Sequence, residues 1–176
     1  MPNEELVKRV LVLASNRRIV AFQNRPKALS QILEDAGIHV ERHLIPDKAD
    51  FDAVIAIWDS RTLSEESSLK KATAYAKQGK LISVKVGRVS PEAWQQMKNE
   101  VQTRQHFDLQ HWNEKRNSID LSGLLSEIEQ VLSYPPILQF IEAKNGTWEQ
   151  RWSYAKSNPA HPSSQDWAKQ YELHAE

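Results

Sequence analysis

Apolar, β-branched stretches recur along the first two thirds of the chain, which is the pattern of buried strands. They cover residues 8–14, 39–44, 51–58 and 81–86, and a shorter candidate edge strand covers residues 106–112. The stretch FDAVIAIW at 51–58 is apolar at nearly every position, which indicates burial on both faces, as in a parallel sheet. We therefore predict a parallel sheet of about five strands.

The segments between these strands have helical periodicity, because apolar residues recur in them at steps of three and four. The predicted helices cover residues 26–36, 64–78, 91–101 and 119–132. Gly37 and Gly79 follow the first two at C-cap positions. Alternating strands and helices predict a doubly wound (flavodoxin-like) α/β fold with strand order 2-1-3-4-5. Residues 45–51 are too few for a helical crossover, so we expect an abbreviated, extended connection there.

The composition changes after Tyr134-Pro135-Pro136, where tryptophan, asparagine and proline replace the alternation of strands and helices. We predict an α/β domain at 1–133 and a Trp-rich α-helical C-terminal extension at 134–176. Its predicted helices cover residues 137–144, 147–157 and 164–174, the second opened by a Thr147-x-x-Gln150 capping box. Trp148 and Trp152 share one helix face, which either packs on the α/β domain or binds a partner.

Composition narrows the functional classes. Lys plus Arg and Asp plus Glu both number 23, so no overall field favours nucleic acid or an anionic membrane. The chain has no cysteine, which excludes disulfides and thiol chemistry. Its first residues, MPNEE, are too acidic for a signal peptide, and no apolar run approaches the roughly 20 residues of a membrane span. We expect a cytoplasmic protein without a metal site.

Polar residues follow the first and third predicted strands, at the edge where open parallel sheets bind ligands. They are Ser15, Asn16, Arg17 and Arg18 after the first strand, and Trp58, Asp59 and Ser60 at the end of the third. Arginine forks onto phosphate, and an indole stacks on a base, so the edge suits a nucleotide. The alternative is that these are solvated loop residues.

Two other ligand chemistries fit the sequence less well. The five glycines are scattered singly, so a phosphate-cradling loop is absent. A phospho-acceptor receiver domain would use Asp59 and Lys85, but Ser15-Asn16-Arg17 stands where its acidic pair should follow the first strand. His106 and His111 are interpreted as surface histidines, because neither lies in a metal-ligand spacing.

A series of motifs runs through residues 51–112. The buried strand FDAVIAIW is followed by a serine-containing turn, a helix, Gly79-Lys80, the apolar strand 81–86, Pro91 and Asp-Leu-Gln-His-Trp at 108–112. In order and spacing this series resembles a bacterial Toll/interleukin-receptor (TIR) domain. The resemblance extends over about residues 9–132.

The resemblance implies an activity and also a missing group. Enzymatic members of the family hydrolyse or cyclise NAD with a glutamate in the helix after the third strand, whose carboxylate stabilises positive charge on the ribose. Ala72 occupies the glutamate position here, at the nicotinamide-ribose end of the implied ligand site, and Ser68 occupies that of an accompanying tryptophan. Glu65 and Glu66 lie about two turns upstream, so using either would need a shift of roughly 9 Å. A nucleoside deoxyribosyltransferase would also want a carboxylate near Ala72.

These observations leave three functions open. The leading hypothesis is a non-catalytic TIR-like module in signalling or innate immunity, which needs no cofactor and binds a protein partner, another copy of itself, or a nucleotide such as NAD. The first alternative is a divergent NAD glycohydrolase that uses Glu65 or Glu66 and releases nicotinamide. The second is a structural subunit of a larger assembly that docks through the extension.

Overall fold

The structure is a computed structural model that describes residues 7–13, 29–41, 51–58, 66–85, 89–103, 106–108 and 119–174. Its strands are β1 (Arg9–Leu13), β2 (His39–Glu41), β3 (Ala53–Trp58), β4 (Leu81–Lys85) and β5 (His106–Asp108). Its helices are α2 (Leu29–Asp35), α4 (Glu66–Lys77), α5 (Pro91–Glu100), α6 (Ile119–Leu132), α7 (Ile137–Lys144), α8 (Trp148–Ser157) and α9 (Ser164–His174).

The described strands form one parallel sheet in the order β2-β1-β3-β4-β5, which confirms the predicted order and the α/β class. β3 is central, and all six of its residues are buried. Its continuous apolarity therefore reflects helices on both faces of the sheet. The described part of β5 covers His106–Asp108, and the remainder of the predicted strand, 109–112, lies outside the described residues.

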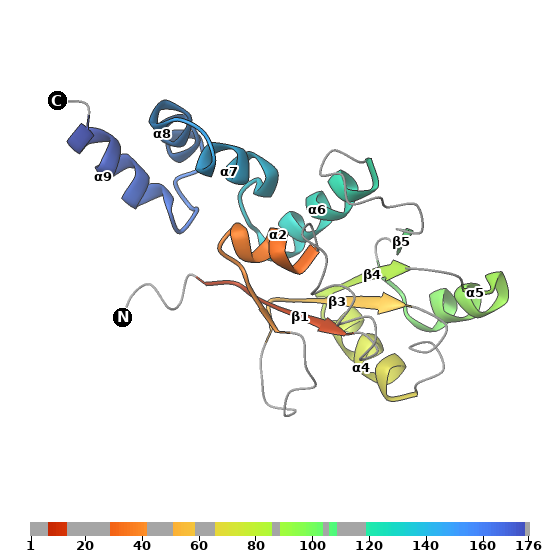
Figure 1. Cartoon of the computed structure of the whole chain (residues 1–176). Coiled ribbons are helices and arrows are strands. Elements are labelled where there is room, and N and C mark those ends of the chain that lie inside the picture. The colour runs from red at the N-terminus through yellow and green to blue at the C-terminus, as the bar shows by residue number, and fades with distance from the viewer. Residues whose placement is uncertain are drawn as a thin grey trace.

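Alternate residues of the strands supply two hydrophobic clusters. Val10, Val12 and Ile55 belong to the first, together with side chains of α2 and α6, whereas Leu11 and Val54 belong to the second, together with side chains of α4 and α5. Figure 1 shows α2 and α6 on one side of the sheet and α4 on the other. The two-residue period of the strands thus separates the two layers of the core.

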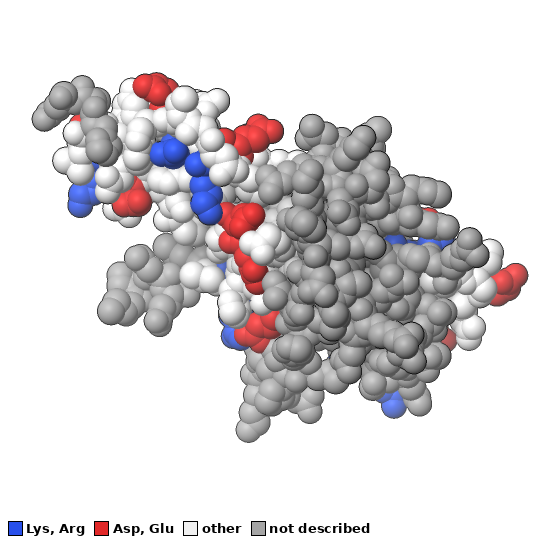
Figure 2. All heavy atoms as spheres, viewed as in Figure 1, with Lys and Arg blue, Asp and Glu red and all other residues white. Residues whose placement is uncertain are grey.

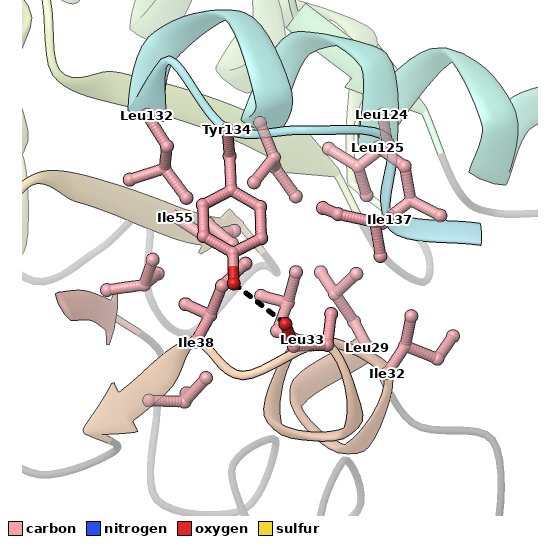
Figure 3. Packing of buried hydrophobic residues seen from close by; sticks show 14 of the residues in the cluster. Leu29, Ile32, Leu33, Ile38, Ile55, Leu124, Leu125, Leu132, Tyr134 and Ile137 are labelled. Carbon is pink, nitrogen blue, oxygen red and sulfur yellow. Dashed lines mark hydrogen bonds between the residues drawn. The ribbon is translucent and has the colours of Figure 1, made fainter. Parts of the chain in front are cut away.

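The extension contains three helices, as predicted. α8 begins after Thr147, whose hydroxyl accepts from the Gln150 backbone N–H while the Gln150 side chain accepts from the Thr147 N–H, so the predicted capping box is present. Ile137, Phe140 and Tyr154 belong to the first cluster, beside Leu29 and Leu33 of α2. The amino-acid composition therefore changes after residue 133, but the first hydrophobic cluster includes residues on both sides of this point (Figure 3).

One backbone carbonyl anchors the extension to α2. The Ala36 oxygen lies 2.7 Å from the Tyr134 hydroxyl, drawn dashed in Figure 3, and 2.9 Å from His161 Nε2. Since the Ser163 backbone N–H donates to His161 Nδ1, the imidazole donates through Nε2 and accepts through Nδ1. The Phe140 ring stacks on this imidazole with its centroid 3.8 Å away. Figure 1 places α7, α8 and α9 beyond the amino-terminal ends of the strands, opposite the arrowheads.

Candidate functional site

The carboxyl ends of β3, β4 and β5 meet at one edge of the sheet. Trp58 is in register with Lys85, and Lys85 is in register with Asp108, so the last residues of these strands are neighbours. Open parallel sheets bind ligands at this edge. The described part of the candidate site therefore consists of these residues and of the α4 and α5 side chains beside them.

Most residues of the expected nucleotide site lie outside the described residues. They are Ser15, Asn16, Arg17, Arg18, Asp59, Ser60 and Glu65, and His111 and the connection at 45–50 lie outside as well. Glu66 is the first residue of α4, but its side chain is not described. Trp58 and Ala72 are the expected ligand-binding residues whose side chains the structure places.

Trp58 is a core residue and offers no face to a ligand. It is 0% exposed and lies in the second cluster with Leu13 and Met97. Its Nε1–H donates to Ser83 Oγ on the neighbouring strand at 2.7 Å, which satisfies the polar atom of the indole. The expectation that Trp58 stacks on a base is therefore wrong, because the layer formed by α4 and α5 covers the ring.

Ala72 is also closed off. Its methyl group is 0% exposed and packs in the second cluster, with Leu69, Tyr75 and Ala76 of the same helix at the margin. Ala72 therefore offers no exposed surface for the expected ligand contact. At the position where the TIR resemblance leads one to expect a glutamate, the structure has an apolar contact between α4 and the sheet.

Lys85 and Asp108 form a polar pair that the sequence did not single out. Lys85 Nζ lies 3.3 Å from Asp108 Oδ2, and the two side chains are 15% and 50% exposed. Lys85 therefore pairs with the carboxylate at the end of β5. The signal in the sequence was the position of each residue at the end of its strand, but the pairing depends on the register between β4 and β5.

Trp94 of α5 is the aromatic centre of this edge. Lys85 Nζ and Lys98 Nζ lie 5.6 Å and 5.9 Å from its ring centroid, within cation–π range. His106 meets the ring in a T-shaped contact with centroids 5.7 Å apart. Burial, and then the nearby Lys98 charge, lower the pKa of His106, so its imidazole is neutral at pH 7.

His106 is half-buried, and so only partly fits its interpretation as a surface histidine. Its Nδ1 is buried and has no hydrogen-bond partner within the described structure. Among the described residues, no three His, Asp or Glu side chains are placed to hold a metal ion. The described edge thus combines cations, a carboxylate and an indole.

The two tryptophans expected to bind a partner make contacts inside the extension. The Trp152 ring stacks on Tyr171 of α9 with centroids 5.1 Å apart, and Lys156 Nζ lies 4.8 Å from the same ring. The Arg151 guanidinium lies 4.4 Å from the Trp148 ring. Both indoles are half-buried. The stack of Trp152 on Tyr171 is explained by the packing of α8 against α9, and no partner protein is needed to explain it.

Surface charge gives no single-signed patch on the described surface seen in Figure 2, where acidic and basic side chains of the extension are interspersed. Of the described helices, none combines the length and apolarity needed to cross a membrane. Comparison of the chain with protein-family models, curated proteins and solved structures gave no match.

Proposed function

We propose that this chain is a non-catalytic TIR-like module that acts in signalling or immune defence by binding a protein partner or a nucleotide. The proposal is supported by the motif series at residues 51–112, and the parallel sheet order is compatible with it. The observation that carries the non-catalytic part is the closed apolar environment of Ala72.

The chemistry of NAD cleavage explains why this observation matters. Breaking the bond between nicotinamide and ribose develops positive charge on the sugar, which a carboxylate beside it must stabilise. Ala72 supplies a methyl group, and the cluster around it is apolar. The described carboxylate at the strand edge, Asp108, is paired with Lys85. This pairing and the apolar surroundings of Ala72 support a non-catalytic role.

The test is an assay for nicotinamide release. The full chain, concentrated and with a crowding agent that favours assembly, is incubated with NAD, and nicotinamide is followed by chromatography. We expect no release above the rate in buffer. Release that is lost in Glu66→Ala or Glu65→Ala, with Glu92→Ala on the exposed side of α5 as control, would overturn the proposal and favour a divergent glycohydrolase.

A further inference from the structure

A cavity of about 280 Å³ opens at the amino-terminal end of β4, on the edge of the sheet opposite the candidate site. The end of α4, the start of β4, the connection from α5 to β5 and two residues of α6 line it. Its lining residues are Ala76, Gly79, Leu81, Gln102, Thr103, Glu127 and Val131. The cavity therefore joins four segments that are far apart in sequence.

The cavity has an exposed rim and a buried floor. Gly79 and Gln102 are exposed, whereas Leu81 and Glu127 are only 3% and 6% exposed. A Cβ atom added at Gly79 would meet nothing within 4 Å, so the space beside this glycine is open. The exposed Gly79 therefore lies on the open side of the cavity.

The lining combines an apolar wall with one acidic side chain. Ala76, Leu81 and Val131 supply the apolar surface, and the Thr103 hydroxyl is already used, because it donates to the Leu81 carbonyl at 3.0 Å. Glu127 is the acidic group of the lining and also interacts within the protein. A carboxylate in a low-dielectric wall attracts positive charge more strongly than one in water.

We propose that this cavity binds a small organic cation, a primary amine on a short unbranched apolar chain, with the ammonium directed to Glu127 and the chain against Ala76, Leu81 and Val131. The volume lies just below the roughly 300–1,000 Å³ of pockets for drug-sized ligands, which restricts the ligand to a short chain. The proposal goes beyond the proposed function, because the cavity lies on the other edge of the sheet.

Three ligands with the same five-carbon chain test the charge preference on the unmodified protein. n-Pentylamine, pentanol and pentanoate are titrated separately by calorimetry. We expect the amine to bind about 10-fold or more tightly than the alcohol, because a hydrogen bond to a charged group adds about 1.5–3 kcal/mol. We expect no heat of binding from pentanoate. Absence of amine binding, or equal binding of all three ligands, would overturn the proposal.

Two variants test the location. Glu127→Gln keeps the size of the side chain and should abolish the preference for amine over alcohol. Ala76→Leu fills the cavity and should weaken both ligands, whereas Ala74→Leu, at an exposed position of the same helix, should leave both unchanged. Amine binding that survives both Glu127→Gln and Ala76→Leu in folded protein would place the ligand elsewhere. These outcomes are independent of NAD cleavage, so either proposal can fail alone.

Discussion

At residue 72 the side chain is a single methyl group that belongs to the core. Ala72 fits between α4 and the sheet, beside Leu11 and Trp58 in the second cluster. A larger or charged side chain would have to displace these neighbours or leave the interface. The packing of the core therefore favours a small apolar side chain at this position.

Ala72→Glu is therefore expected to destabilise the protein without creating an NAD glycohydrolase. Overpacking costs about 1–3 kcal/mol, and desolvation of the new carboxyl group adds to it, so we expect the free energy of unfolding to fall by about 3 kcal/mol. Urea unfolding measures this, with Ala74→Glu at an exposed position of the same helix as the control. A stable Ala72→Glu protein that cleaves NAD would show that residue 72 reaches a ligand site.

His161 makes stability depend on pH. Burial lowers its pKa to about 4, against an opposing contribution from its hydrogen bond to Ala36. Its ordinary value is 6.5, so between pH 6.5 and about 4 the unfolded chain binds a proton that the folded chain does not. The contribution of neutral His161 to the free energy of unfolding is fully present above pH 6.5. It is lost as the pH falls toward 4, and the total loss is about 3 kcal/mol.

Chemical unfolding between pH 4 and pH 7.5 checks this prediction. His161→Phe, which cannot titrate at this position, should have a flatter pH profile than the unmodified chain. Identical slopes for His161→Phe and the unmodified chain would contradict the assignment.

At the scale of elements, two glycines end helices in the left-handed region, with φ of +91° at Gly37 and +71° at Gly79. A Cβ at Gly37 would also lie 3.2 Å from the Tyr134 hydroxyl, whereas one at Gly79 would meet nothing within 4 Å. We expect Gly79→Ala to cost about 1–2 kcal/mol for backbone strain alone. Gly37→Ala should lower the free energy of unfolding more than Gly79→Ala does, and thermal unfolding of both variants measures the difference. Equal losses would show that the Tyr134 hydroxyl moves aside freely.

The sequence predicted elements whose signals are local. Thr147 and Gln150 marked the start of α8, and Gly37 and Gly79 marked the ends of α2 and α4, because capping depends on residues within one turn. The surroundings of Trp58 could not be predicted in this way. Whether its indole met a ligand or Ser83 depended on which helices cover the sheet, and this is decided by contacts between segments far apart in sequence.

At the scale of the whole molecule, the extension completes the core of the α/β unit. Ile137, Phe140 and Tyr154 cover α2 side chains in the first cluster. A chain that ends at residue 133 should therefore lose stability and self-associate, since apolar surface of α2 and α6 becomes exposed. Thermal unfolding and light scattering measure both effects.

A second truncation separates the parts of the extension. A chain that ends at residue 163 lacks α9 but keeps Phe140, Tyr154 and His161, so it should be intermediate in stability. If the chain that ends at residue 133 proved as stable as the full chain, the extension would be an independent unit that only rests on the α/β domain.

The shared Ala36 carbonyl also has a consequence for biosynthesis. Tyr134 and His161 reach it across 98 and 125 positions of the chain, so a segment synthesised later docks on the end of the first described helix. A nascent chain whose α2 ends incorrectly has no acceptor for either side chain, and its tail stays undocked and open to proteolysis. Docking of the extension would then depend on whether α2 has already folded.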